Sequence, residues 1–221
     1  DFCYKFSWSP LGVLKALMST SVSIRNGDIF TVTKPWESVE LYPLPMPWGE
    51  DEFEVYPNRD SLPFIEQYQM DDGLQIKQFV RGTLRYKGWK NAWGDIFSEV
   101  DTLDASIAEA RLKEISDDLW DRYSYKDGEV DRVILTVELK VENDTEVVWH
   151  KQYLMDTLGN DNGSAMAQLV SCSVALAVEA VLGNEISSGV TAAPHQSKLV
   201  SRWLDQAEDI SDHFVLIDHL N

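Results

Sequence analysis

A strict alternation of aliphatic and polar residues in the second half of the chain limits its fold more than any other pattern. The alternating aliphatic residues are Val133, Leu135, Val137, Leu139 and Val141. Side chains on a strand point to opposite faces in turn, so this pattern predicts a half-buried β-strand. The Asn-Asp pair at 143–144 then suits a loop that returns the chain through residues 145–155. We therefore predict a long antiparallel hairpin.

Two long helices are predicted on either side of this hairpin. Residues 104–123 carry apolar side chains at helical spacing, with Asp104 placed to cap the helix. Gly163 and Ser164 precede a second helix, 165–182, which is apolar on nearly every side. This all-round apolarity predicts a core helix, because the segment is too short and too rich in Ala and Ser for a membrane span.

The first part of the chain predicts shorter elements. Aromatic residues alternate between positions 2 and 8, as on a strand, and Ser9-Pro10 is typical of a helix start. Asn26-Gly27 suits the tight turn of a hairpin. Residues 34–51 hold four prolines and predict an ordered extended loop, since proline cannot donate a hydrogen bond to a sheet. A polyproline ligand is the weaker alternative, because the interleaved aromatic residues would anchor such a loop to its own core.

Together these elements predict an α+β fold. Further strands are expected at 53–56 and 76–85, and a further helix at 88–100. We expect a mixed, largely antiparallel sheet packed with helices. We assign residues 1–88 and 129–221 to this domain and residues 89–128 to a small helical lobe.

The overall charge restricts the partners. The chain has 37 acidic residues and 19 Lys and Arg, a formal net charge of −18. Nucleic acid and anionic membranes require surplus basic residues, so neither is an expected partner. Two cysteines in 221 residues do not form a disulfide framework, and no segment has the pattern of a signal peptide. We expect a cytoplasmic protein, and the initial Asp suggests a piece of a longer chain.

One basic island interrupts this acidic chain. From Gly73 to Gly94 there is no Asp or Glu, and the five basic residues of that stretch are Lys77, Arg81, Arg85, Lys87 and Lys90. A local excess of positive charge in so acidic a chain is most simply explained by an anionic ligand.

The spacing within the island selects particular residues. If 76–85 is one strand, Arg81, Thr83 and Arg85 share a face, and Gly82 leaves room between them. Guanidinium groups bind carboxylates or phosphates through paired hydrogen bonds. Arg59 lies just before a predicted helix N-terminus, which also favours an anion. The alternative is that these arginines pair with acids on the surface or across an interface.

Other candidate sites have weaker patterns. The N-terminus of the predicted helix 165–182 is a second possible anion site, although Ser164 as a simple N-cap is the favoured interpretation. The four histidines show no metal-binding spacing with the cysteines. No phosphate loop or glycine-rich dinucleotide fingerprint is present, so no bound cofactor or metal is expected in this chain itself.

Three motifs together resemble one enzyme family. They are Tyr4-Lys5-Phe6-Ser7-Trp8-Ser9-Pro10, Tyr56-Pro57-Asn58-Arg59-Asp60-Ser61 and Arg81-Gly82-Thr83-Leu84-Arg85-Tyr86-Lys87-Gly88-Trp89. In order and spacing they are similar to the C-terminal part of the L-glutamate-forming saccharopine dehydrogenases. The resemblance implies that a Rossmann domain, which binds NAD or NADP, precedes this region in the whole protein. It also implies a substrate-binding and dimerisation domain with a helical insertion. That insertion is shortened in this chain, to roughly residues 89–128.

The resemblance also implies a substrate and its contacts. The family interconverts saccharopine, which has three carboxylates, with glutamate and aminoadipate semialdehyde in lysine metabolism. Arg59, Thr83 and Arg85 are then expected to contact substrate carboxylates, with Arg81 less firmly assigned and Phe6 packing on the substrate. Catalytic residues are expected mostly in the missing half, so this part alone should be inactive. A relative acting on carboxynorspermidine or another secondary amine, and a non-catalytic dimerisation or binding module, remain alternatives.

Overall fold

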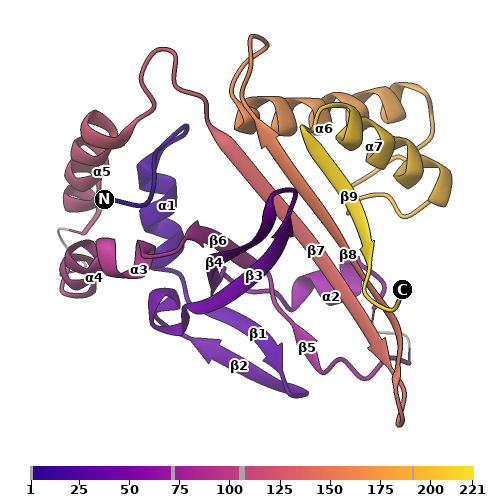
Figure 1. Ribbon diagram of the computed structural model, residues 1–221. Helices are drawn as coiled ribbons and strands as arrows, with labels where there is room; N and C mark the ends of the chain where they lie inside the picture. Colours follow the sequence, from indigo (N-terminus) through magenta and orange to yellow (C-terminus); the bar gives the residue numbers. More distant parts are fainter. Residues whose placement is uncertain (1, 71–72, 105–107, 191) are drawn as a thin grey trace. The chain divides into compact units, whose positions relative to one another are not determined.

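The computed structural model describes residues 2–70, 73–104, 108–190 and 192–221. Contacts divide the chain into two compact units, Asp1–Tyr125 and Lys126–Asn221 (Figure 1). Helices accompany three small sheets of three strands each, and the strands of each sheet pair antiparallel. The predicted α+β class is confirmed. The predicted grouping of residues 1–88 with 129–221 in one domain stays a prediction.

The first unit contains two of the three sheets. Its elements are α1 (Pro10–Leu17), β1 (Ser21–Arg25), β2 (Asp28–Val32), η1 (Pro35–Ser38), β3 (Glu40–Met46), β4 (Gly49–Pro57), α2 (Pro63–Gln67), β5 (Gln78–Phe79), β6 (Gly82–Tyr86), α3 (Trp89–Ala92), α4 (Gly94–Asp101) and α5 (Ala108–Tyr123). The strand orders are β2-β1-β5 and β3-β4-β6. The predicted cap of α5 at Asp104 borders residues 105–107, which lie outside the described residues.

The predicted hairpin at Asn26-Gly27 is confirmed. Both residues have positive φ, 53° and 86°, and they join β1 to β2 in register. Asparagine and glycine tolerate this left-handed backbone, which matches the twist of the two strands.

The prediction of an extended loop at 34–51 is wrong for most of that stretch. Residues 40–46 form β3, in which Pro43 pairs with Glu52 and Pro45 with Glu50. β3 is an edge strand of the β3-β4-β6 sheet, and no further described strand pairs with its outer side. An edge strand tolerates proline, which has no N–H to donate to a neighbouring strand.

Two other strand predictions are also corrected. Residues 2–8 do not form a strand of their own: the Phe6 N–H donates to the Tyr123 carbonyl, and the Tyr125 N–H donates to the Phe6 carbonyl. Residues 76–85 form two strands, because β5 pairs with β1 whereas β6 pairs with β4. Arg81 lies between them, so strand geometry does not place it on one face with Thr83 and Arg85.

Aromatic residues form the centre of the first unit. Phe6, Trp89 and Trp93 have no exposed surface. Tyr56 of β4 stacks on Trp89 with ring centroids 4.9 Å apart, and Trp36 stacks on Phe97 at 5.1 Å. Aliphatic side chains of α1 and α5 complete this core, among them Leu14, Leu17, Leu112, Ile115 and Leu119.

The second unit contains the predicted long hairpin. Its elements are β7 (Arg132–Glu142), β8 (Val147–Leu158), α6 (Ala165–Leu182), α7 (Ser197–Asp209) and β9 (His213–Asp218). The strand order is β7-β8-β9, and Figure 1 shows the two long strands of the hairpin beside β9. The Asn143 side chain accepts hydrogen bonds from the N–H groups of Thr145 and Glu146, which closes the hairpin loop.

The prediction that helix 165–182 is a core helix is wrong in this structure. Only Ala165 and Ala180 are buried, and Val170, Val174 and Val178 are 52–58% exposed along one side of α6. By length and composition α6 is also the one described helix that could cross a membrane, and only 11% of it is buried. The helix instead presents an apolar side that no described residue covers.

The apolar face of β7 is also more open than a half-buried strand requires. Leu135, Val137, Leu139 and Val141 are 42–53% exposed. Among their cross-strand partners on β8, Trp149 is 38% exposed, whereas Met155 is buried, so the open part of this face lies toward the Val141–Trp149 end of the hairpin. The alternation correctly predicted a strand with one apolar face, but that face is not buried by this chain.

The core of the first unit predicts a selective loss of stability. Leu14 is fully buried, so Leu14→Ala should lower the free energy of unfolding by about 2–5 kcal/mol through lost burial and a residual cavity. Leu41→Ala is the matched control, because Leu41 is 54% exposed and its loss should change stability by less than about 0.5 kcal/mol. Chemical denaturation followed by tryptophan fluorescence measures both. Equal losses would contradict the assigned core.

Candidate substrate-binding site

The turn after β4 holds two of the predicted arginines next to each other in the fold. The Asn58 N–H donates to the Arg81 carbonyl at 2.8 Å, and the Arg81 N–H donates to the hydroxyl of the fully buried Ser61 at 3.0 Å. Arg59 lies inside this turn with a φ of 55°, and its carbonyl accepts a hydrogen bond from Val22. The backbone of Arg59 and that of Arg81 are therefore fixed by the same hydrogen-bonded turn.

β6 carries the other two predicted residues. Its register with β4 places Thr83 opposite Tyr56 and Arg85 opposite Glu54. Opposite residues in a sheet share a face, so these four side chains lie on one side of the β4-β6 pair. Gly82 fits the close approach here, because an added Cβ would lie 2.6 Å from the Val55 side chain.

Aromatic rings surround the guanidinium of Arg85. Its central carbon lies 4.6 Å from the centroid of Tyr4 and 5.5 Å from those of Tyr56 and Trp89. One Nη donates to the Tyr56 hydroxyl at 3.0 Å, and the other donates to the Leu84 carbonyl at 2.9 Å. Among the described residues, the buried Nε atom has no hydrogen-bond partner. The rings hold the cation in place and leave its charge uncompensated.

The acid that faces Arg85 is directed elsewhere. Both carboxylate oxygens of Glu54 accept backbone hydrogen bonds at the start of α3, from Gly88 at 2.9 Å and from Lys90 at 2.7 Å. A carboxylate is stabilised at a helix N-terminus, where backbone N–H groups have no partner within the helix. Glu54 therefore caps α3 instead of neutralising Arg85.

The remaining predicted residues differ in their surroundings. Arg81 is exposed and lies over the Phe64 ring at 3.8 Å, and Arg59 is exposed at the turn. Thr83 is partly buried beside Tyr56. Phe6 is fully buried against Tyr4 and Trp93, so solvent reaches none of it, and its contact with a substrate stays a prediction.

Ion pairing separates the arginines into two groups. Five of the eight pair with a carboxylate: Arg25, Arg111, Arg122, Arg132 and Arg202. Within the described residues, the other three, Arg59, Arg81 and Arg85, have no carboxylate within 4.0 Å. In a chain with 37 acids, three unpaired arginines around one strand pair make a site suited to an external anion. Lys87 of the same island pairs with Glu52.

The second predicted anion site is already filled by the chain. The Asp131 carboxylate accepts hydrogen bonds from the N–H groups of Ala165 and Met166 at the N-terminus of α6, at 2.7 Å and 3.2 Å. The Ser164 hydroxyl accepts from Ala167, so its predicted role as N-cap is confirmed. An external anion would have to displace Asp131.

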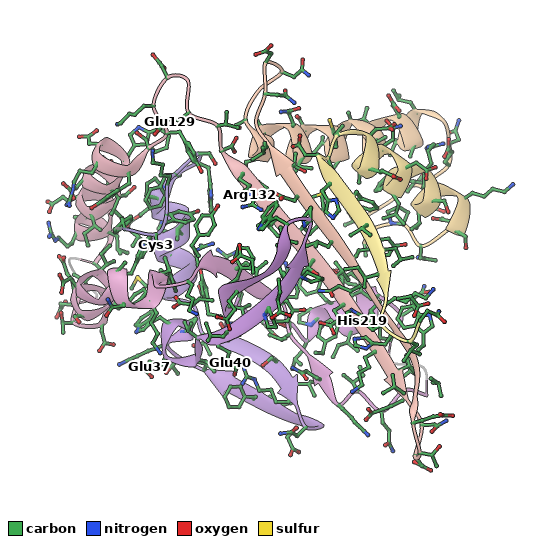
Figure 2. All side chains as sticks on the ribbon, in the orientation of Figure 1. Cys3, Glu37, Glu40, Glu129, Arg132 and His219 are labelled. Atoms are coloured by element: carbon green, nitrogen blue, oxygen red, sulfur yellow. The ribbon has the colours of Figure 1, made fainter. Side chains whose placement is uncertain are left out.

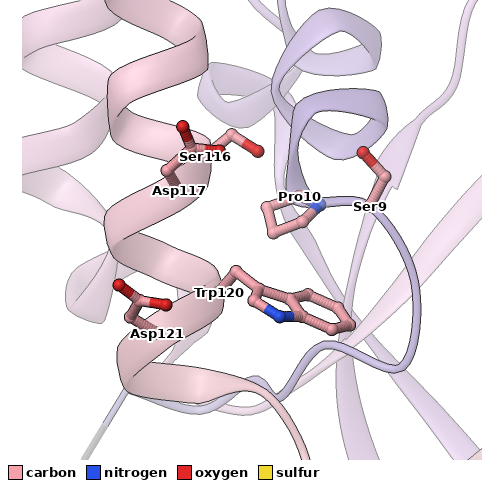
Figure 3. A pocket seen from close by; sticks show the side chains of 6 residues that line it. All are labelled: Ser9, Pro10, Ser116, Asp117, Trp120 and Asp121. Atoms are coloured by element: carbon pink, nitrogen blue, oxygen red, sulfur yellow. The ribbon is translucent and has the colours of Figure 1, made fainter.

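A surface hollow elsewhere in the first unit does not suit an anion. It has a volume of about 470 Å³, and Figure 3 shows the side chains of α1 and α5 that line it. Its lining is Ser9, Pro10, Ser116, Asp117, Trp120 and Asp121. Two carboxylates and no basic side chain would repel a polycarboxylate, so the arginine cluster remains the candidate site.

Sequence reasoning missed the aromatic residues around Arg85. Tyr56 and Trp89 stand at the ends of two of the quoted motifs, and Tyr4 belongs to the aromatic alternation, but no sequence pattern marks any of them as a site residue. Only the β4-β6 register and the packing of α3 bring their rings to the guanidinium.

Comparisons with known proteins agree on one family. Residues 1–210 match the family model for the saccharopine dehydrogenase C-terminal domain. Saccharopine dehydrogenase (NADP(+), L-glutamate-forming) of Pyricularia oryzae is 27% identical over 89% of this chain and 58% of its own length. Mitochondrial alpha-aminoadipic semialdehyde synthase of Mus musculus is 39% identical over 40% of this chain and 9% of its own.

A solved structure shows the same fold. The apo saccharopine dehydrogenase (L-Glu forming) of Saccharomyces cerevisiae superposes with a TM-score of 0.71 at 22% identity, covering 97% of this chain and 62% of its own. The Pyricularia match runs over 266 residues although this chain has 221, so that relative holds extra residues between matched segments. A shortened insertion produces such a difference in length.

The fold and the arginine cluster define an α+β domain suited to an anionic ligand. The chain belongs to the saccharopine dehydrogenase C-terminal domain family, which confirms the resemblance. It spans 58% of the length of the Pyricularia relative and 62% of the Saccharomyces chain.

Tyr56 gives the site a signature at alkaline pH. Burial raises the pKa of Tyr56 above its usual 10, although the charge of Arg85 and the Thr83 hydroxyl oppose the shift. A raised pKa favours the protonated phenol in the folded state, so this stabilisation is complete below pH 10. It is lost as the pH rises through the folded-state pKa.

We therefore expect the free energy of unfolding of the wild type to fall more steeply above pH 10 than that of Tyr56→Phe. The control is Tyr68→Phe, because Tyr68 is 53% exposed and should leave the slope unchanged. Denaturation curves at several pH values measure the slopes. Equal slopes for the wild type and Tyr56→Phe would show that Tyr56 titrates normally.

Proposed function

We propose that the whole protein is an NAD(P)-dependent, saccharopine dehydrogenase-like oxidoreductase of lysine metabolism, and that this chain supplies its substrate-binding part. The substrate class is a secondary amine with several carboxylates. The observation that carries the proposal is the group of three arginines, Arg59, Arg81 and Arg85, without a carboxylate partner among the described residues.

Arg85 is the central contact of the proposed site. Its aromatic surroundings fix the plane of the guanidinium, so little conformational entropy is lost when an anion binds. A substrate carboxylate would supply the charge that Glu54, directed to α3, does not. Thr83, on the same face, would add a hydroxyl donor. Arg59 and Arg81, at the other end of β6, would then receive a second carboxylate.

The hydride acceptor would be NAD or NADP, held by a Rossmann domain elsewhere in the protein. The curated Pyricularia relative carries NADP(+) in its name, and the match to this chain covers only part of that protein. In this proposal, the Rossmann domain binds the cofactor, and this chain binds and orients the substrate carboxylates. We further propose a reducing compartment such as the cytoplasm, because two cysteines in 221 residues do not make a disulfide framework.

A second candidate function is the oxidation of carboxynorspermidine or another secondary amine. A substrate with fewer carboxylates and more amines would need fewer arginines and more acids. The three unpaired arginines therefore favour a polycarboxylate. A non-catalytic binding module is the third candidate, and the open apolar face of the β7-β8-β9 sheet is the feature that supports it.

An assay of the full-length protein tests the proposal. We expect reduction of NAD or NADP with saccharopine and slower reduction with carboxynorspermidine. Arg85→Gln should raise KM for saccharopine about 10- to 100-fold, because a lost hydrogen bond to a charged group costs about 1.5–3 kcal/mol. Arg111→Gln is the matched control, since Arg111 pairs with Glu99 on the surface and its loss should leave KM unchanged.

Three outcomes separate the candidates. Turnover of carboxynorspermidine alone would replace the leading proposal by the second, and turnover of neither substrate would favour the binding module. If Arg85→Gln melts at a much lower temperature with unchanged KM, the aromatic site around Arg85 has a structural role.

We also propose that the protein is a homodimer through the open face of the β7-β8-β9 sheet. This face carries Val137, Leu139 and Trp149 at 38–48% exposure. Such an apolar surface is uncommon on a monomer unless it binds a partner. A second copy is the occupant that the family resemblance implies.

Light scattering of the full-length protein tests the dimer. Val137→Asp should give the monomer mass at a concentration at which the wild type is dimeric, because a charge on this face would be buried without a partner. Leu41→Asp is the control, since Leu41 is exposed on β3 in the other unit. A monomeric wild type would contradict the homodimer, and a dimeric Val137→Asp variant would place its interface elsewhere.

A further inference from the structure

Two histidines and a glutamate of the second unit lie together at one end of the β7-β8-β9 sheet. Glu138 is on β7, His150 is on β8, and His219 directly follows β9. One ligand atom from each side chain lies within 4.8 Å of the other two. Figure 2 labels His219 near the C-terminus. The proposed function uses none of these side chains.

The sheet itself brings the three residues together. The register places Glu138 opposite Gln152, so Glu138 is the diagonal neighbour of His150 on the same face. The His219 N–H donates to the His150 carbonyl at 3.0 Å, which continues the β8-β9 pairing beyond the end of β9. Three neighbouring strands therefore each contribute one side chain at the same level.

The side chains already interact with one another. The Nε2 atom of His150 lies 2.7 Å from a carboxylate oxygen of Glu138, within hydrogen-bond distance. The rings of His150 and His219 stack with centroids 4.2 Å apart and planes 23° apart. The side chains of Glu138 and His150 are 35% and 21% exposed, so an ion can reach them from solvent.

A buried amide fixes the orientation of His219. The Thr136 hydroxyl donates to the Tyr153 carbonyl, so its oxygen accepts from the amide nitrogen of Gln152 at 2.9 Å. The amide oxygen of Gln152 then faces Nε2 of His219 at 3.0 Å, and that nitrogen must donate. A neutral His219 consequently keeps its lone pair on Nδ1. Metal-binding histidines show this arrangement, in which one nitrogen donates to a carbonyl and the other is available to the metal.

We propose that Glu138, His150 and His219 form a binding site for a divalent transition-metal ion, with Zn²⁺ the best match. Two imidazoles and one carboxylate are a ligand set that Zn²⁺ prefers, and water would take a fourth position. The ion replaces the proton shared between His150 and Glu138. The bound ion links β7, β8 and β9 where the C-terminal strand ends.

The surrounding charges are compensated. Lys140 lies opposite His150, but its ammonium is 3.4 Å from a Glu142 carboxylate. Lys151 is likewise 3.5 Å from Asp218. Each of these two ammonium groups therefore has a carboxylate partner of its own. The histidine spacing in the sequence gave no indication of this site, because its members come from three strands.

Titration of the full-length protein with Zn²⁺ tests the site. We expect saturable binding at pH 7.5 and a melting temperature that rises with the Zn²⁺ concentration. His150→Ala should abolish one binding equivalent, and Gln152→Leu should weaken that equivalent about 10- to 100-fold by removing the partner of His219. His213→Ala is the matched control, because His213 lies at the opposite end of β9 and should leave binding unchanged.

Circular dichroism of each variant establishes that it is folded before the titration. Equal Zn²⁺ stoichiometry in the wild type and in His150→Ala would overturn the proposal, as would the absence of saturable binding in the wild type. The NAD(P)-linked assay is independent of this titration, so failure of the metal site leaves the proposed function untouched. If His150→Ala unfolds, Glu138→Gln serves in its place, since it keeps the size of the side chain and removes the ligand charge.

Discussion

The stacking of Tyr56 on Trp89 is the contact on which the first unit and its candidate site both depend. It joins β4 to α3, and Trp89 continues into the aromatic core through Trp93. The same two rings form walls around the guanidinium of Arg85. Stability and ligand recognition therefore share one set of side chains, since burying large rings supplies free energy and their faces hold a cation.

The distribution of charge complements this packing. Most arginines of the chain are neutralised by its many acids, whereas the acid that faces Arg85 is used to cap α3. At the N-terminus of α6, by contrast, the predicted anion site is already occupied, because the Asp131 carboxylate accepts a hydrogen bond there. Whether a positive site in this fold is open to an external anion thus depends on where the backbone N–H groups hold the nearby carboxylates. The number of acidic residues alone does not decide whether a site is open.

Sequence patterns predicted the fold well where a local rule acts alone. Alternation predicted the β7-β8 hairpin, and Asn26-Gly27 predicted the first turn. Prediction from sequence failed where pairing with a distant strand decides the secondary structure. Proline argued against β3, but an edge strand tolerates proline. Residues 76–85 have the pattern of one strand, but β1 pairs with the part that forms β5 and β4 pairs with the part that forms β6.

The sequence by itself determined the α+β class, the basic island and the family to which the chain belongs, because these depend on local periodicity, composition and motif order. It also selected Arg59 and Arg85 among the basic residues. Only the tertiary structure decided which arginines lack a carboxylate, that three rings surround Arg85, and that α6 leaves a valine face open. Pairing and burial are relations between residues distant in the chain, so spacing along it cannot encode them.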